Sequence, residues 1–124
     1  IHWEYYKGAR YVLQPGQFIL ASTVESLTLP SNVLADIKGK STIGRTGLSV
    51  EFAGFIDSGF HGNVTLEIVN HLPFAYTLYS GQLIAQIRFA VCDEPENDYS
   101  KSNTYHKQTG PTKANTSKLY KYCP

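Results

Sequence analysis

The stretch AGFIDSGFHGNVTLEIVN, residues Ala53–Asn70, decides how this chain folds. In its second half Val64, Leu66 and Ile68 alternate with polar residues, which is the period of a strand with one buried face. Glycines crowd its first half, as is typical of a tight hairpin. The stretch therefore predicts a hairpin that runs into a half-buried strand, with Glu67 on the face opposite the aliphatic one.

The same strand period continues on both sides of this stretch. Short runs rich in β-branched and aromatic residues are separated by Pro, Gly, Asn and Ser turn signals. No window shows a sustained helical stripe, and the best helix candidate is a turn or two beginning at Ser41–Thr42, whose hydroxyls suit an N-cap. Many short strands at regular spacing favour an all-β sandwich or barrel. The expected strands are Tyr11–Leu13, Gln17–Thr23, Val33–Ile37, Asn63–Asn70, Phe74–Leu78 and Leu83–Val91.

Composition limits the class of protein. The 124 residues suffice for one domain, and a hydrophobic share of 42% with a net charge of +1 is that of a globular protein. It is not that of a disordered or strongly nucleic-acid-binding chain. No apolar run reaches the length of a membrane span, and no signal peptide is visible. This composition predicts no membrane or direct nucleic-acid contacts. The location that we expect is the cytoplasm of a microbial or virus-infected cell, although the sequence does not begin with Met and gives no targeting signal to judge.

The composition changes near residue 92. From Asp93 to Lys121 the chain is polar, with few aliphatic residues, and this pattern predicts a mobile tail. We expect residues 1–92 to form one β domain and residues 93–124 a polar tail. The two cysteines, Cys92 and Cys123, specify neither a disulfide framework nor a zinc site.

A second segment, KSTIGRTGL at Lys40–Leu48, gathers cations and hydroxyls at the expected helix start. The cations are Lys40 and Arg45, and the hydroxyls belong to Ser41 and Thr42. At a helix start the free backbone N–H groups and the positive end of the helix dipole both face the same point, so the segment is suited to binding an anion. It is not a P-loop, because the required glycine spacing is absent. The alternative is an ordinary capped helix with solvated charges.

Two acids follow within the deciding stretch. Asp57 in the hairpin could hold a sugar hydroxyl while the ring of Phe60 packs on the sugar, although Asp is also a common turn residue. Glu67 in the strand suits a general acid/base whose carboxylate lies near a cation such as Arg45, the alternative being a solvent-facing strand residue. The zinc route to base deamination lacks its His-x-Glu and Pro-Cys-x-x-Cys motifs here, and the four histidines show no metal-ligand spacing.

The joint pattern resembles the deoxycytidine triphosphate (dCTP) deaminases and their relatives, the trimeric dUTPases. The resemblance runs from Val12 to Thr112, about four fifths of the chain. Ala53–Phe60 is similar to the nucleoside hairpin of members that both deaminate and hydrolyse. Glu67 stands where the deaminases carry their catalytic Glu, whereas dUTPases lack an acid there. Tyr105 and the residues up to Thr112 match the C-terminal segment that closes over the triphosphate.

The resemblance implies a fold and partners. The fold is a distorted jelly-roll, and the assembly is a homotrimer with active sites between subunits. The substrate is a deoxynucleoside triphosphate, and magnesium is bound through its phosphates. Neither zinc nor a metal-ligating residue of the protein is implied.

The resemblance also implies roles for individual residues. Glu67 would shuttle protons as hydroxide adds to C4 of cytosine and ammonia leaves, and Arg45 would orient Glu67 and the attacking water. Asp57 would hold the 3′-hydroxyl and help to position water for phosphate cleavage, while Phe60 would pack on the deoxyribose. Lys40 stands where an Arg is usual. The residues expected to bind the nucleotide are Lys40, Ser41, Thr42, Ala53, Gly54, Phe55, Asp57, Phe60, Tyr105 and Gln108.

The chain departs from the family pattern in three places. Deaminases usually have a His and a Thr just before the hairpin, where this chain has Ser49–Phe52 and is one residue shorter. Thr104 stands where a Lys is expected, and the N-terminal family segment is not in this sequence. The leading prediction is a dCTP deaminase of either the dUTP-forming or the dUMP-forming kind. The alternatives are a dUTP diphosphatase and a non-catalytic trimer that uses the fold as a virion component or a regulator.

Overall fold

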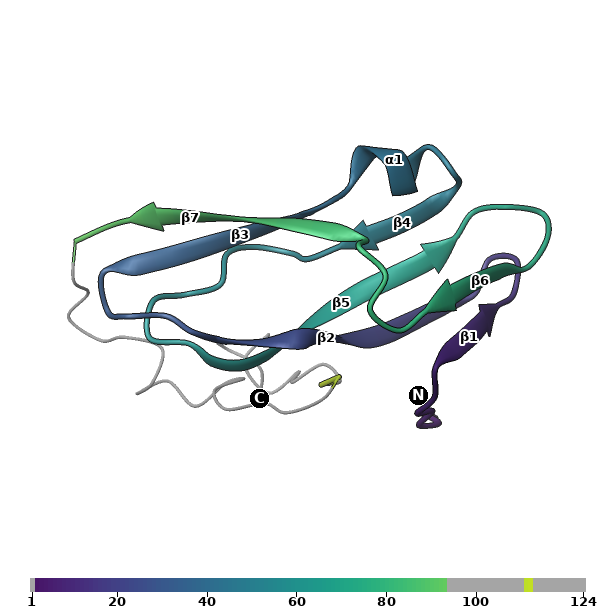
Figure 1. Cartoon of the computed structure of the whole chain (residues 1–124), viewed down its shortest axis with the longest axis horizontal. Helices are drawn as coiled ribbons and strands as arrows, with labels where there is room; N and C mark the ends of the chain where they lie inside the picture. The colour runs from purple at the N-terminus through teal and green to yellow at the C-terminus, as the bar shows by residue number, and fades with distance from the viewer. Residues whose placement is uncertain (1, 94–110, 113–124) are drawn as a thin grey trace, which may run out of the picture.

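The computed structural model describes residues 2–93 and 111–112, and in them strands dominate (Figure 1). A short helix, α1, lies between the third and fourth strands. No helix in the described ranges is long and apolar enough to cross a membrane. The elements are β1 (Arg10–Leu13), β2 (Phe18–Thr28), β3 (Val33–Gly39), α1 (Ser41–Gly44), β4 (Leu48–Glu51), β5 (His61–Asn70), β6 (Tyr76–Tyr79) and β7 (Ala85–Val91).

The strands form three antiparallel sheets. β5 is the central strand of the largest sheet, with β2 on one side and β4 on the other, while β3 pairs with β7 and β1 with β6. Figure 1 shows β3 and β7 running alongside each other above the layer that holds β2 and β5. A bridge between Ala35 and Ile56 ties β3 to the chain before β5. These crossing connections between sheets agree with the predicted distorted jelly-roll.

The core lies between the sheets because β5 alternates as the sequence predicts. Val64, Leu66 and Ile68 are at most 4% exposed, and each points inward. They pack with buried apolar residues from the other strands, and this arrangement buries one face of the largest sheet. The remaining core residues are Leu13, Leu29, Ala35, Ile37, Leu48, Val50, Ile56 and Phe60.

A buried amide fixes the end of β5. Asn70 is fully buried, and its Nδ2 donates to the carbonyl oxygens of Leu13 at 3.0 Å and Phe74 at 2.9 Å. Its Oδ1 accepts a hydrogen bond from the backbone N–H of Leu72 at 2.9 Å. Three of the four hydrogen bonds that an amide can make are therefore formed, as the burial of a polar group requires. Asn70 thus joins β1, β5 and the turn that leads to β6.

The strand predictions are confirmed, with shifted ends for most of them. β2 extends to Thr28, five residues beyond the predicted end, after a register irregularity between Ser22 and Ser26. β4, at Leu48–Glu51, has no counterpart among the predicted strands. Its four residues are too few to show a period, and pairing with β5 defines it.

The predicted helix exists but is only α1, four residues long. The prediction that the Ser41 and Thr42 hydroxyls cap it is wrong. Lys40 is the N-cap residue, with extended backbone angles, and no side chain caps the helix. Both hydroxyl residues lie inside the first turn and are exposed.

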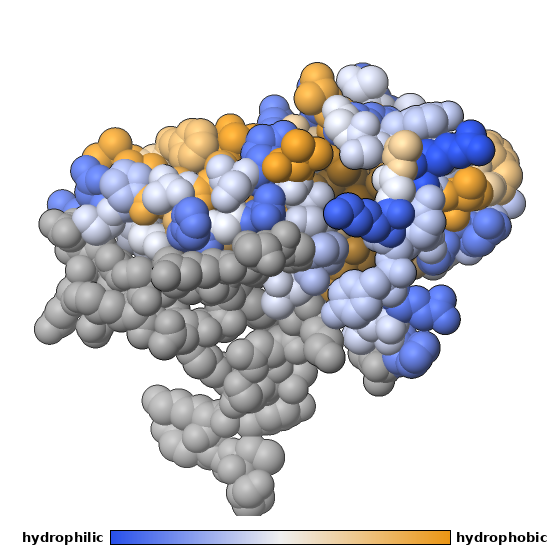
Figure 2. Space-filling view, turned by 60° about the horizontal axis from the view of Figure 1, so that its bottom comes forward, coloured by the Kyte–Doolittle hydropathy of each residue, from blue (hydrophilic) through white to orange (hydrophobic). Residues whose placement is uncertain are grey.

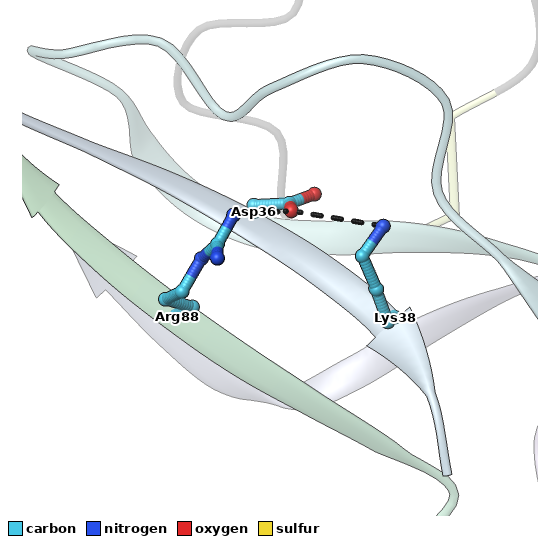
Figure 3. Close-up of polar contacts among 3 residues, drawn as sticks. All are labelled: Asp36, Lys38 and Arg88. Carbon is cyan, nitrogen blue, oxygen red and sulfur yellow. Dashed lines mark hydrogen bonds and ion pairs between the residues drawn. The ribbon is translucent and has the colours of Figure 1, made fainter. Parts of the chain in front are cut away.

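The outer face of the β3–β7 sheet carries a small charge cluster (Figure 3). Asp36 and Arg88 are cross-strand partners, and their side chains meet at 3.4 Å between Oδ2 and Nη2. Lys38 approaches the same carboxylate oxygen at 3.9 Å. The Asp36 side chain is 14% exposed, so the cations satisfy a carboxylate that is largely withdrawn from water.

Hydrophobic surface is left uncovered on the described part of this chain. The space-filling view shows hydrophobic residues reaching the exterior among polar ones (Figure 2). An apolar hollow of about 180 Å³ lies between β2 and β7, and its lining includes Leu27, Leu66 and Ile87. Ile87 and Phe89 of β7 are 38% and 53% exposed although they share the face of the buried Ile37 and Ala35.

Candidate functional site

Glu67 lies on the outer face of the largest sheet. Its neighbours Leu66 and Ile68 are buried, whereas Glu67 itself is exposed on β5. The prediction that this carboxylate lies opposite the aliphatic face is confirmed. The hydrogen bonds of β5 to β2 and β4 on both sides hold its backbone in place, with Leu20 and Glu51 as the direct partners of Glu67.

The residue paired with Glu67 on β4 is also a glutamate. Glu51 and Glu67 are opposite each other in the antiparallel register, so both side chains extend from the same face. Both are exposed. Within residues 2–93 and 111–112, no ion pair or hydrogen bond reaches either carboxylate. The face therefore presents two adjacent acceptor groups.

Other polar residues of this face do have partners. Ser49 of β4 hydrogen-bonds His71 across the sheet, at 2.5 Å between Oγ and Nε2. Thr65 of β5 accepts a hydrogen bond from the backbone N–H of Thr112 at 2.9 Å. The described piece of the C-terminal segment, residues 111–112, therefore lies against the same face as Glu67.

A polar hollow of about 370 Å³ adjoins this face. It lies between the end of β3, the start of α1 and the whole of β4, and the residues that line it include Lys40, Ser41 and Glu51. Close packing of β3 on β4 shapes it, because a Cβ built on Gly39 would come within 2.8 Å of the carbonyl oxygen of Val50. Lys40 and Ser41, which are predicted to bind phosphate, thus line the same hollow as Glu51, the cross-strand partner of Glu67.

Two members of the predicted phosphate segment lie apart from the hollow. Thr42 is exposed on α1, and Arg45 is exposed just after it. Arg45 forms no ion pair within the described ranges, so this single chain does not bring its guanidinium to Glu67. The expected role of Arg45 in orienting Glu67 stays a prediction.

The hairpin places Asp57 and Phe60 differently. Asp57 is exposed at the turn, where its carbonyl accepts a hydrogen bond from the N–H of Phe60 at 3.2 Å, and Gly59 has a φ of 81°. Phe60 is only 6% exposed and belongs to the core. Its ring therefore packs inside the domain and leaves little surface for the predicted contact with a deoxyribose.

The remaining predicted binding residues fall into two groups. Ala53, Gly54 and Phe55 form an exposed loop between β4 and the hairpin, with the Phe55 side chain 60% exposed. Tyr105 and Gln108 lie outside the described residues. No group of three or more His, Cys, Asp or Glu side chains in the described part of the chain could hold a metal ion.

Sequence reasoning missed Glu51 and His71 as members of this face. His71 reaches Ser49 only because β4 pairs with β5, and Glu51 reaches Glu67 for the same reason. The signal that could have found them is the departure at Ser49–Phe52, which marks the four residues before the hairpin as unusual.

The comparison with family models gives one match. Residues 2–92 match a model described as dCTP deaminase-like. Among individual proteins, the dUMP-forming dCTP deaminase of Persephonella marina is 44% identical over 103 residues, or 82% of this chain and 56% of that protein. The enzyme of the same name from Mycobacterium tuberculosis is 43% identical over 110 residues, covering 85% and 58%. The chain thus spans little more than half the length of these relatives.

The comparison with solved structures finds the same fold. A Staphylococcus bacteriophage 80alpha dUTPase with dUpNHpp superposes with a TM-score of 0.61 at 20% identity, covering 72% of this chain and 69% of that one. The phage phi11 dUTPase described with a structural Mg(II) ion has the same TM-score and identity, covering 72% and 75%. At these identities the likeness concerns the fold alone.

Proposed function

This chain belongs to the dCTP deaminase-like family, and we propose on that basis that it performs the hydrolytic deamination of dCTP. The observation that carries the proposal is the position of Glu67. Glu67 is exposed on the central strand of the largest sheet, at the place where the family resemblance expects the catalytic acid. A group held by hydrogen-bonded neighbours on both sides can keep the orientation that proton transfer needs.

The chemistry assigned to Glu67 is proton transfer. Glu67 takes a proton from water as the water oxygen bonds to C4 of cytosine, and it returns protons to the amino group. The C4–N4 bond then breaks, so that dCTP and water give dUTP and ammonia. In the dUMP-forming version a second water attacks the phosphorus nearest the sugar, and diphosphate leaves.

The phosphates of the substrate are assigned to the polar hollow. Lys40 and Ser41 line it, and a cation with a hydroxyl is suited to phosphate oxygens. The other proposed nucleotide contacts are Thr42, Asp57 and the exposed loop at Ala53, Gly54 and Phe55, together with Tyr105 and Gln108, which lie outside the described residues. Magnesium would arrive with the triphosphate, since it commonly binds through substrate phosphates.

The proposed assembly is a homotrimer with sites between subunits. On one chain the Glu67 face is exposed, and within the described ranges Arg45 forms no ion pair with Glu67. A neighbouring subunit would supply the missing walls, and the exposed apolar side chains would add contact area. A deoxynucleotide substrate fits the cytoplasmic location expected from the sequence.

Two other functions fit the fold. A dUTP diphosphatase would use the same phosphate contacts and would not need Glu67. A non-catalytic trimer would keep the shape without turnover, and the replaced segment Ser49–Phe52 favours it.

The test is incubation of the purified protein with dCTP and, separately, with dUTP in the presence of magnesium, with products resolved by chromatography. We expect dCTP to give dUTP or dUMP. Diphosphate release from dUTP with dCTP untouched would move the assignment to a dUTP diphosphatase. Turnover of neither nucleotide by a trimeric preparation would leave the non-catalytic function.

A further inference from the structure

The strand β7 forms an edge of its sheet, and its sequence does not protect that edge. Within residues 2–93 and 111–112 its one strand partner is β3, so the side of β7 away from β3 is unpaired (Figure 1). Unpaired edges tend to pair with other chains, and proteins usually blunt them with Lys, Pro, a bulge or a short strand. β7 has seven residues, with the sequence AQIRFAV, and contains neither Lys nor Pro. It pairs with β3 without a register shift.

The other strand edges in the described part of the chain are protected. β2 has a register irregularity between Ser22 and Ser26, and an exposed acid, Glu25, lies within it. The strands β1, β4 and β6 have only four residues each. On its side away from β7, β3 forms a bridge from Ala35 to Ile56. Among the described strands, β7 is therefore the long one that is left open to pairing.

The face of β7 that turns toward the core is also uncovered. Ile87, Phe89 and Val91 alternate along this face and are 38%, 53% and 82% exposed. Ile87 and Phe89 lie opposite Ile37 and Ala35 of β3, which are buried. The apolar hollow between β2 and β7 adjoins the same face, because Ile87 lines it. Contact of such a face with water is unfavourable, so a cover for it stabilises the protein.

The direction of the free backbone groups follows from the hydrogen bonds of β3. Ala35 exchanges two backbone hydrogen bonds with Ile56, at 2.9 and 2.8 Å, so its N–H and C=O point away from β7. In an antiparallel pair its partner Phe89 then points its own N–H and C=O away from β3. By the alternation of a strand, Ile87 and Val91 do the same. These three residues thus combine unpaired backbone groups at the edge with apolar side chains on one face.

We infer that β7 pairs with β7 of a second copy of this chain, antiparallel and with Phe89 at the twofold axis. In this register Phe89 and Phe89 of the partner subunit exchange two backbone hydrogen bonds. Ile87 lies opposite Val91 of the partner subunit, so the apolar side chains of both copies come together. Arg88, the one charged residue of β7, lies opposite the partner subunit's Ala90. A register centred on Arg88 would instead place two like charges opposite each other, which is destabilising.

The area of the edge and its apolar face suits a second copy. The exposed fractions of Ile87, Phe89 and Val91 correspond to roughly 300 Å² of apolar side chain on each copy, of which the aromatic ring is a large part. Two copies bring roughly 600 Å² together. The two paired backbone edges add the remainder of the about 1,000 Å² that a specific interface needs. One partner strand therefore both satisfies the backbone groups and covers the apolar face.

This contact is separate from the proposed active site and does not depend on the proposed function. No residue of β7 lines the polar hollow that is assigned to the phosphates. A twofold contact gives an even number of chains. Alone it makes a dimer, and together with the proposed trimer it makes a hexamer of two trimers.

The first test is the mass of the full chain in solution, measured by light scattering for the unsubstituted protein and for Phe89→Lys. We expect an even-numbered assembly whose mass falls by half in Phe89→Lys, because two cations then meet at the axis. The matched control is Val24→Lys, at a side chain on β2 that is 71% exposed, and it should keep the original mass. A monomer or a trimer of the unsubstituted protein, or an unchanged mass of Phe89→Lys, would overturn the inference.

A disulfide test checks the register and does not need a charged variant to fold. In a protein with Cys92→Ser and Cys123→Ser, Phe89→Cys should form a covalent dimer on oxidation, because residues opposed at the axis lie within disulfide distance. Ala90→Cys should stay monomeric in denaturing electrophoresis, since Ala90 lies opposite the partner subunit's Arg88. Any other pattern would contradict the inferred register.

Ammonia release from dCTP, measured on the same samples, reports on the proposed function independently. Turnover without the covalent dimer would refute only the β7 contact. A covalent dimer without turnover would support the β7 contact and refute only deamination.

Discussion

Two cross-strand charge pairs face outward from this domain, and they are built in opposite ways. On β3 and β7, Asp36 faces Arg88, and the side chains meet at 3.4 Å. On β4 and β5, Glu51 faces Glu67 with no counter-charge in the described ranges. The first pair satisfies a carboxylate that is largely withdrawn from water. The second pair leaves both carboxylates without a partner in the described part of the chain. We therefore assign a structural role to the first pair and a functional role to the second.

The largest effect that would test this comparison is expected at Glu67. Glu67→Gln keeps the shape of the side chain but removes the proton carrier, so ammonia release from dCTP should fall by about 10²- to 10⁴-fold. Nucleotide binding, measured by calorimetry, should persist. Glu25→Gln, at another exposed acid in β2, is the control and should retain activity.

The next effect concerns the inner side of the same strand. Ile68 is fully buried directly beside Glu67 in sequence, and Ile68→Ala should lower the free energy of unfolding by about 2 to 5 kcal/mol. Denaturant unfolding measures this change. Val69→Ala, on the outer side, should cost clearly less; equal losses at both positions would contradict the division of β5 into a structural and a functional side.

A smaller loss is expected at Asn70. Asn70→Ala removes three hydrogen bonds and leaves the Leu13 and Phe74 carbonyls without their side-chain donor. We expect a loss of about 1 to 3 kcal/mol in the free energy of unfolding. An unchanged melting temperature would show that water can replace the hydrogen bonds of the Asn70 amide. The amide would then not be needed to hold β1 against β5.

The sequence predicts some of the contacts behind these expectations and not others. The alternation of Val64, Leu66 and Ile68 is local, so it predicts both the strand and the outward position of Glu67. The pairing of β4 with β5 is not local, and four residues carry no period. The sequence could therefore show that Ser49–Phe52 is unusual but not that it puts Glu51 opposite Glu67.

Two other features of the site depend on packing that short-range patterns do not contain. Phe60 follows a hairpin turn and could equally face a ligand, yet the domain places it in the core at 6% exposure. The hydroxyls of Ser41 and Thr42 suit an N-cap by type, but the chain turns one residue earlier, at Lys40. Residue type alone does not decide between two such adjacent positions.

The two charge pairs themselves should give small stability effects of opposite sign. Glu51→Gln relieves a like-charge contact and should raise the free energy of unfolding by about 0.2 to 1 kcal/mol. Parallel denaturant titrations at low salt would measure the gain. A loss of stability would mean that Glu51 has a structural partner after all.

The smallest effect is expected at Arg88. Its side chain is 76% exposed, and Arg88→Ala should cost at most about 1 kcal/mol of unfolding free energy, with Lys38 still near Asp36. Ammonia release should not change. A large loss of activity would place the β3–β7 face in the site and remove the contrast between the two pairs.

The most direct test of the central claim, that water adds to C4 of dCTP at the Glu67 face, is turnover in ¹⁸O-labelled water followed by mass spectrometry. The account predicts one labelled oxygen on the uracil base for each ammonia released. A label found only in phosphate, or no ammonia at all, would contradict deamination as the activity of this chain.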